Sequence, residues 1–175
     1  EEGGHSADKI LSADEVVKSP GIPETAEMVL KIRAATIPVI SEIEFAFRYK
    51  GDSKIIAITG SNGKTTTTAL IHHVCTVGGI DAALTGNIGF SFAMQVAEDP
   101  KPLYVIEISS FQLDDIKAFR PDVAVLTNIT EDHLDRYDHR FENYIRSKFR
   151  IIENQTESDV FIYNEDDEVT KKNID

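Results

Sequence analysis

The stretch Lys54-Ile55-Ile56-Ala57-Ile58-Thr59-Gly60-Ser61-Asn62-Gly63-Lys64-Thr65-Thr66 decides how this chain is interpreted. The apolar run 54–59 predicts a buried strand, and the residues that follow predict a helix ended by Gly78-Gly79. Glycines between a strand and a helix let backbone N–H groups converge on phosphate oxygens at the helix N-terminus. The stretch therefore predicts a phosphate loop formed by Gly60, Ser61, Asn62, Gly63, Lys64, Thr65 and Thr66.

The side chains of the same stretch fit that interpretation. Lys64 can reach the terminal phosphates of a nucleotide, and the hydroxyl of Thr65 can bind Mg²⁺. The usual spacing places another glycine five residues before Gly63, where this chain has Ile58, so the loop has the shorter form Gly-x-x-Gly-Lys-Thr. A plain glycine-rich turn is the alternative, but strand, glycines, Lys and Thr together favour phosphate binding.

Around the loop, apolar runs alternate with helical patterns. Runs that are continuous rather than alternating indicate strands covered on both faces, and their alternation with helices predicts a mostly parallel α/β sheet. The expected strands are Lys54–Thr59, Asp81–Leu84, Leu103–Ile108, Asp122–Thr127 and Asp159–Tyr163. The fold class is thus a P-loop-type α/β domain with flanking helices, preceded by part of a second α/β domain.

Residues 14–50 show a weaker version of the same alternation. We expect strands at Glu15–Val17 and Ile37–Ile40, a turn at Ser19–Pro23, a helix at Glu24–Ala35, and a helix to about Tyr49 that opens with a Ser41–Glu44 capping box. The polar stretch 50–53 is the expected linker, which divides the chain near residue 52. Because the sequence starts Glu1-Glu2-Gly3-Gly4 without Met, we expect an internal part of a longer protein.

Composition narrows the function. The 175 residues are 41% hydrophobic and 27% charged, which excludes disordered and collagen-like chains. No apolar run approaches 18 residues, so no membrane span is expected. Eighteen Lys and Arg against 30 Asp and Glu give a net charge of −12, which argues against nucleic-acid binding. The single cysteine, Cys75, is expected to be a small buried hydrophobe, and because it cannot form an internal disulfide it fits a reducing compartment.

Three features fall near the predicted strand ends, where ligands of open α/β sheets bind. Glu107 interrupts an apolar strand and is a candidate Mg²⁺ ligand, the alternative being a carboxylate that faces water. His133, in Asp132-His133-Leu134-Asp135, is a candidate ligand or a surface residue. Lys148 shares a helical face with apolar residues, so it must snorkel, form a pair or react; burial would lower its pKa.

Several stretches together resemble the Mur ligases. They are the loop Thr59–Thr66, Gly86-Asn87-Ile88-Gly89, Glu107–Leu113, Asn128–Tyr137 and Ser19–Pro23. Glu107–Leu113 and Asn128–Tyr137 are most similar to the members of the family that add D-glutamate. The family has three domains, for UDP, ATP and the incoming amino acid. The resemblance implies that residues 1–52 end the UDP-binding domain, that residues 53–175 begin the ATP-binding domain, and that the third domain is absent.

The resemblance also implies a chemistry. ATP would phosphorylate the carboxylate of UDP-N-acetylmuramoyl-L-alanine, and the amine of D-glutamate would attack the acyl phosphate, in peptidoglycan precursor synthesis. Lys64, His133 and Lys148 would be catalytic. The ATP phosphates would lie on the loop, and the first Mg²⁺ on Thr65 and Glu107. The second would lie on His133 and on Lys148 as a carbamate. Ser19, Pro20, Gly21, Asn87 and Ser109 would contact the muramoyl substrate.

Three alternatives stay open. A sibling ligase, for another amino acid or for folylpolyglutamate, shares the loop and the His133 region but fits Ser109–Leu113 less well. A P-loop kinase or GTPase would explain Lys64 but not His133 together with Lys148. The 175 residues are also consistent with a nucleotide-binding module without catalysis, and the chain alone is expected to be inactive. No membrane, nucleic acid or obligate protein partner is implied.

Overall fold

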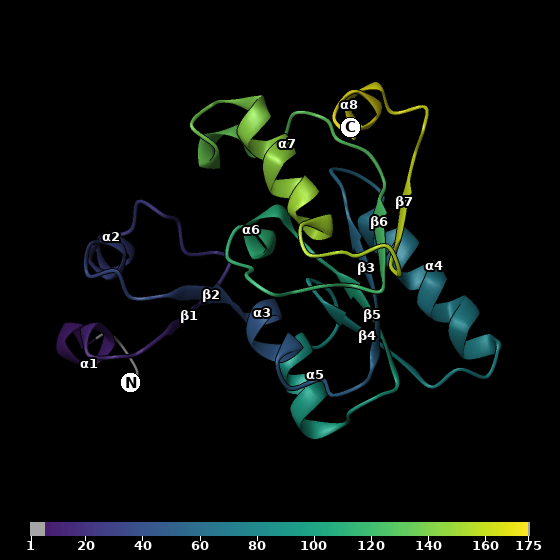
Figure 1. The fold of residues 1–175 in the computed structure, drawn as a ribbon, viewed down its shortest axis with the longest axis horizontal. Helices are drawn as coiled ribbons and strands as arrows, with labels where there is room; N and C mark the ends of the chain where they lie inside the picture. Colours follow the sequence, from purple (N-terminus) through teal and green to yellow (C-terminus); the bar gives the residue numbers. More distant parts are fainter. Residues whose placement is uncertain (1–5, 175) are drawn as a thin grey trace.

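The computed structural model describes residues 6–174. Residues 1–5, the start of the segment predicted at 1–52, and Asp175, the end of the segment predicted at 53–175, lie outside that range. The described chain forms two bodies, seen side by side in Figure 1. The smaller one holds α1 (Ala7–Leu11), β1 (Val16–Lys18), α2 (Glu27–Ala34) and β2 (Val39–Ser41). Because β1 and β2 pair in parallel across α2, this body is a βαβ unit, the repeating element of Rossmann-like domains.

The larger body is a five-stranded sheet in the order β4-β5-β3-β6-β7, with every neighbouring pair parallel. The strands are β3 (Lys54–Thr59), β4 (Ala82–Gly86), β5 (Leu103–Glu107), β6 (Val123–Leu126) and β7 (Val160–Tyr163). Each lies within two residues of its expected position. The predicted parallel α/β sheet is therefore confirmed.

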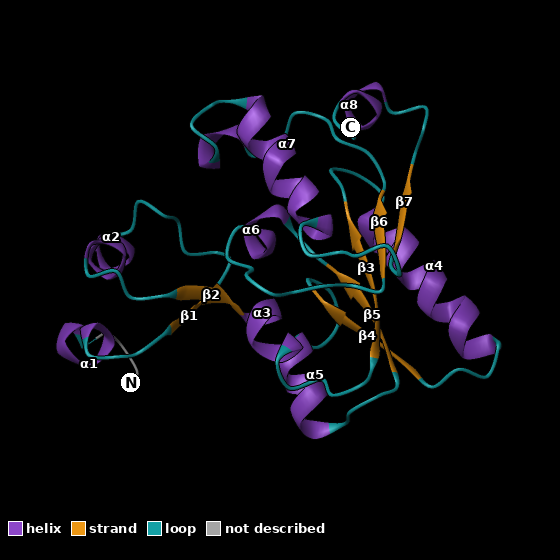
Figure 2. Cartoon of the chain, in the orientation of Figure 1, coloured by secondary structure: helices purple, strands orange, loops and turns teal. Residues whose placement is uncertain are grey.

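Helices cover both faces of this sheet, as Figure 2 shows. On one face lies α4 (Lys64–Val77); on the other are α3 (Glu42–Phe47), α5 (Phe92–Glu98), α6 (Ser110–Leu113) and α7 (Phe141–Phe149), while α8 (Glu168–Lys172) follows β7. The two short 3₁₀ turns are Leu134–Arg136 and Arg150–Ile152. The main core joins Ile55, Ala57 and Ile106 to side chains of α3, α5 and α6.

Helix α4 is the less covered of the two layers. Ile71 packs against the sheet, but Leu70 and Val74 are 59% and 60% exposed. The expectation that Cys75 is buried is wrong, because its side chain is only partly covered. Among the described residues α4 is the one helix on that face of the sheet, so residues on its outer side meet no second layer.

Helix α3 departs from the expected capping box. Ser41 caps it by accepting the Glu44 N–H at 3.2 Å, as predicted. The carboxylate of Glu44 does not return to Ser41; it accepts the N–H groups of Lys117, Ala118 and Phe119 at 2.8–2.9 Å. Helix α3 thus packs on the larger body although it precedes residue 52, while the division of the chain near residue 52 stays a prediction.

The smaller body is joined to the larger by ion pairs at Asp115. This carboxylate lies 3.2 Å from the Lys18 amine and 2.6 Å from the Arg33 guanidinium, and its own side chain is 4% exposed. Glu24 pairs with the same two cations. Helix α2 begins three residues later than expected, since 24–26 form a turn in which Ala26 N–H donates to Pro23. Over residues 6–174 no helix is long and apolar enough to span a membrane.

Candidate functional site

The carboxyl ends of the strands share one edge of the sheet because all of them are parallel. The loops after β3, β4, β5 and β6 meet there, with β3 at the centre of the strand order. A pocket of about 300 Å³ lies among them. It is lined by Pro20, Gly21, Lys64, Asn87, Ser109, Ser110, Phe111, Asp132, His133, Tyr144 and Lys148. Residues expected from six separate stretches thus surround one cavity.

The phosphate loop has the backbone that its glycines allow. Gly63 precedes α4 with φ +82°, and Gly60 has φ +145°. A Cβ on Gly60 would lie 2.0 Å from Thr127 Oγ1, so only glycine fits against the loop that follows β6. Lys64 Nζ donates to the carbonyls of Gly60 and Ser61 at 2.9 Å each. Since the first N–H groups of a helix have no partner within it, the turn at 64–66 can hold an anion.

Lys148 is buried beneath the same loop, with 2% of its surface exposed. Its Nζ donates to the Gly60 carbonyl at 2.7 Å and lies 3.4 Å from Thr59 Oγ1. Burial, and then the positive charge of Lys64, lower the pKa of Lys148 to about 7. The inward face predicted from helical spacing is therefore present, and a large share of the amine is neutral near neutral pH.

Helix α7, which carries Lys148, is held in place by a buried carboxylate. Asp114 accepts hydrogen bonds from Ser147 Oγ at 2.6 Å and from Tyr137 Oη at 2.9 Å. Burial raises the pKa of Asp114, and burial together with the nearby Asp114 charge raises that of Tyr137. The bond to Ser147 ties α7, the helix that carries Lys148, to the end of α6.

Glu107 ends β5 inside the protein and is 1% exposed. Its Oε1 accepts Asn87 Nδ2 at 2.7 Å, while its buried Oε2 has no hydrogen-bond partner. An unpaired buried carboxylate oxygen is costly, and a cation would offset that cost. Among residues 6–174 no group of three or more His, Cys, Asp and Glu side chains converges. A cation here would take its other oxygens from hydroxyls, water and a bound phosphate, as Mg²⁺ does.

His133 lines the pocket and has a left-handed backbone, φ 50° and ψ 30°. Its side chain is 54% exposed; Nε2 is 3.4 Å from Asp132, and the ring centroid is 5.2 Å from that of Phe111. Left-handed non-glycine residues are uncommon, and strained backbone of this kind concentrates at functional sites.

The remaining predicted residues fall into two groups. Pro20, Gly21, Asn87 and Ser109 line the pocket, although Ser109 also caps α6, where its hydroxyl donates to Gln112 Oε1 at 3.0 Å. Ser19, Thr65 and Glu107 are not among the lining residues. Thr65 and Thr66 are exposed in the first turn of α4, beside the loop.

Sequence reasoning assigned no role to two residues that shape the site. Arg136 stacks 4.3 Å from the centroid of the Phe111 ring and donates to the Pro20 carbonyl at 3.2 Å, which fixes the turn of the smaller body beside the pocket. Asn128 follows β6 and bonds to the phosphate loop. A polar residue at the end of an apolar strand is the sequence feature that could have indicated Asn128.

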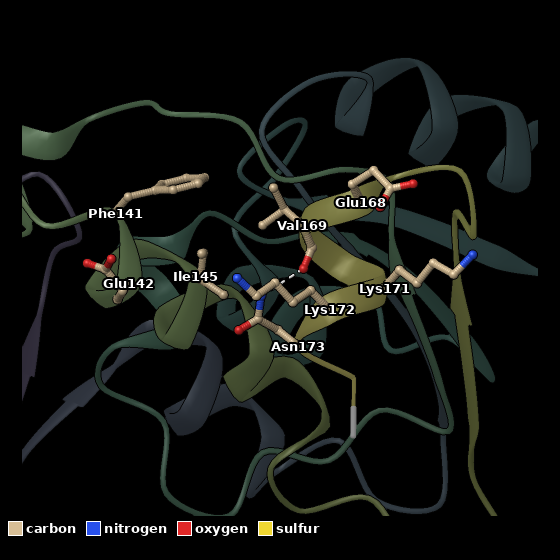
Figure 3. A pocket seen from close by; sticks show the side chains of 8 residues that line it. All are labelled: Phe141, Glu142, Ile145, Glu168, Val169, Lys171, Lys172 and Asn173. Atoms are coloured by element: carbon tan, nitrogen blue, oxygen red, sulfur yellow. Dashed lines mark hydrogen bonds between the residues drawn. The ribbon is translucent and has the colours of Figure 1, made fainter.

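A larger cavity, of about 610 Å³, lies between α7 and α8. Figure 3 shows side chains of the two helices facing each other across it, with Phe141 and Ile145 on α7 and Val169 on α8. None of the predicted site residues is among its lining residues. Its size therefore does not make it the site, since it lacks the two lysines, Lys64 and Lys148, that line the smaller pocket and converge on the Gly60 carbonyl.

Comparison with known proteins identifies the family. The family model described as "Mur ligase middle domain" matches residues 58–175. The chain belongs to the Mur ligase family. A Mur ligase from Bacteroides fragilis, named UDP-N-acetylmuramoylalanine–D-glutamate ligase, is 59% identical over 175 residues, which are 100% of this chain and 39% of that protein. A Porphyromonas gingivalis Mur ligase of the same name is 58% identical over 167 residues, 95% of this chain and 37% of its own length.

Solved Mur ligase structures share the fold. The MurF ligase of Thermotoga maritima in complex with ADP superimposes with a TM-score of 0.63 at 19% identity, over 94% of this chain and 48% of that one. The UDP-N-acetylmuramate–alanine ligase of the same organism gives a TM-score of 0.58 at 23% identity, over 97% of this chain and 39% of that one. At these identities the match concerns the fold alone. The chain spans about two fifths of the length of its curated Mur ligase relatives.

Proposed function

We propose that the protein containing these residues is an ATP-dependent, ADP-forming ligase that joins D-glutamate to UDP-N-acetylmuramoyl-L-alanine in peptidoglycan precursor synthesis. One observation carries the proposal: Lys64 and Lys148 converge on the Gly60 carbonyl within a pocket whose other walls hold Asn87, Ser109 and His133. The name of the 59%-identical relative supports the choice of D-glutamate.

In the proposed reaction, the γ-phosphoryl group of ATP passes to the substrate carboxylate and ADP leaves. The amine of D-glutamate then attacks the acyl phosphate, losing a proton and releasing phosphate as the amide forms. The N–H groups of the loop and the Lys64 amine hold the phosphates and offset the charge that develops on them. Asn87, Ser109 and the turn Ser19–Gly21 orient the muramoyl substrate.

The orphaned oxygen of Glu107 fits Mg²⁺, and we propose that Glu107 and Thr65 hold one ion while His133 and Lys148, as a carbamate, hold a second. When bound, Mg²⁺ neutralises phosphate charge. The lowered pKa of Lys148 supplies the neutral amine that combines with CO₂. The carbamate exchanges a costly buried cation for an anion with two oxygens.

The proposal also includes the domain organisation of the protein and its cellular location. Residues 1–52 belong to the domain that binds the UDP group and residues 53–175 to the domain that binds ATP; the match of the family's middle domain to residues 58–175 supports this division. The incoming amino acid binds outside these 175 residues. The protein acts in the bacterial cytoplasm.

The decisive measurement is ADP release by the intact protein with UDP-N-acetylmuramoyl-L-alanine and each candidate amine. We expect release that depends on D-glutamate, with the new amide identified by mass spectrometry. Dependence on L-lysine or on a folate would overturn the substrate assignment. The 175-residue chain alone should release no ADP, and turnover by it would contradict the proposal that the amino acid binds elsewhere.

A further inference from the structure

The loop that follows β6 is hydrogen-bonded to the phosphate loop through the side chain of Asn128. Asn128 Oδ1 accepts the Asn62 N–H at 3.0 Å, and Asn128 Nδ2 donates to the Asn62 carbonyl at 3.0 Å. One side-chain amide therefore satisfies both backbone groups of Asn62, as a neighbouring strand would. With both groups paired, the peptide planes on either side of Asn62 cannot rotate freely.

Further hydrogen bonds join the same two loops. The Ser61 N–H donates to the Asn128 carbonyl at 2.9 Å, and Thr127 Oγ1 donates to the Asn62 carbonyl at 2.7 Å. Ser61 Oγ donates to the Thr130 carbonyl and accepts the Thr130 N–H, each at 2.9 Å. Asn62 itself is exposed, whereas Ser61 is only 8% exposed, so these bonds extend from the rim of the site toward its interior.

These hydrogen bonds affect the start of α4 because of the position of Asn62 in the loop. It immediately precedes Gly63, whose left-handed backbone turns the chain into α4 and aims the N–H groups at the start of that helix. The direction of those groups follows from the peptide planes at Asn62. A shortened loop has fewer residues of its own to hold that shape, so its neighbour can supply the constraint.

We propose that Asn128 is a positioning residue for nucleotide binding: through Asn62 it holds the phosphate loop in the conformation that receives the phosphates. Asn128 acts through the loop backbone. The inference rests on the proposed nucleotide-binding function of the loop and adds a residue to which that proposal gives no role.

A matched control separates positioning from ordinary stabilisation. Asn154 Nδ2 donates to the carbonyls of Lys117 and Phe119 at 3.1 and 3.0 Å, so it also ties a loop through a side-chain amide. That loop lies at the start of β6, at the opposite end from the phosphate loop. Asn154→Ala removes a comparable contact and should lower stability by a similar amount.

The test measures ADP affinity by calorimetry in the intact protein, in EDTA, well below the melting temperature of each variant. Asn128→Ala should weaken ADP binding about tenfold, the size expected for one or two lost hydrogen bonds. Asn128→Asp should weaken it further at low salt, because it adds a negative charge beside the phosphates, and less so at high salt. Asn154→Ala should stay within about twofold. Exchange of the Asn62 amide hydrogen should quicken in Asn128→Ala alone.

The outcomes separate a failure of the Asn128 inference from a failure of the proposed nucleotide-binding function. If the wild-type protein binds no ADP, the proposed function fails first. If Lys64→Ala weakens binding while folded Asn128→Ala binds like wild type, the loop function stands and the role of Asn128 is overturned. If neither Asn128 variant folds, Thr127→Val decides, since it removes a donor to the same Asn62 carbonyl without changing shape. Unchanged affinity there overturns the inference, and weakened affinity supports it.

Discussion

The two loops that contribute Lys64 and His133 to the lining of the pocket are built differently. The phosphate loop, Gly60–Thr66, is bonded to the loop after β6 through Ser61 and Asn62 and carries two lysine amines on the Gly60 carbonyl. The second loop, 131–139, is anchored at Arg136 and the buried Tyr137, yet His133 is largely exposed.

The backbone of the second loop is strained where the first is relaxed. His133, Asp138 and His139 all have φ between 50° and 56°, whereas the positive φ angles of the phosphate loop belong to Gly60 and Gly63. The first loop is thus preorganised by hydrogen bonds and glycines. The second keeps its strain and exposure, which fits a part of the site that ligands complete. Substitutions at four residues test this difference.

The largest effect is expected at Lys148, which lies beneath the preorganised loop. In the intact protein, Lys148→Ala should lower turnover by at least about a hundredfold, because it removes the group proposed to carry the carbamate. ADP affinity should change by no more than about threefold. Steady-state rates and calorimetry give the two numbers, and the exposed Lys171→Ala is the control. Near-wild-type turnover would leave Lys148 as a packing residue.

The same lysine should leave a mark on stability. Its folded pKa of about 7 lies below the ordinary value of 10.5, so between these values the unfolded chain binds more protons than the folded one. This group therefore makes stability rise with pH from about 7 to 10.5, and its unfavourable contribution is fully present below pH 7. Lys148→Met should flatten that slope in urea unfolding measured across the range. An unchanged slope would contradict the burial of a charged amine.

Next in size is Lys64, on the phosphate loop itself. Lys64→Ala should weaken ADP binding by about 1.5–3 kcal/mol, the value of a charge-assisted hydrogen bond. The melting temperature should change little, since the amine bonds only to two carbonyls of the loop and the side chain belongs to no apolar core cluster. Calorimetry beside thermal unfolding checks both, and equal ADP affinity would show that the loop is an ordinary turn.

Glu107 tests whether the preorganised side also provides a metal ligand. Glu107→Gln should reduce the gain in ADP affinity on adding Mg²⁺ by roughly tenfold, because a charged ligand is lost. Binding in EDTA should be nearly unchanged. The comparison of the two conditions is made in wild type, in Glu107→Gln and in Glu142→Gln, an exposed control on α7. If the Mg²⁺ gain is identical in all three, Glu107 is not in the metal site.

The smallest effect probes the strained loop. His133→Gly should be about 1 kcal/mol more stable than His133→Ala, because glycine adopts positive φ without steric cost. Both should lose the function of the imidazole, so their activities should fall alike. Denaturant midpoints measure the difference. Equal midpoints would show that the left-handed backbone stores no strain, and the contrast between the two loops would then rest on exposure alone.

The sequence predicted the local parts of the fold well. Continuous apolar runs located the strands of the large sheet within two residues, and the glycines after the first of them located the turn from β3 into α4, whose role in phosphate binding stays a prediction. Helical spacing placed Lys148 on an inward face, which its burial confirms. It was less reliable for the smaller body, where α2 starts three residues late because Pro23 and the following turn delay it.

What the sequence determined by itself are features whose physical cause is local: periodicity, glycine backbone freedom and the apolar character of buried strands. Tertiary structure alone decided the strand order, and with it that the ends of β3, β5 and β6 are neighbours. It also turned Glu44 from its expected cap to amides 73–75 residues away, and left Cys75 partly uncovered. Asn128 reaches Asn62 across 66 residues for the same reason. Such contacts depend on which strands lie side by side, and the local sequence around each residue does not determine the strand order.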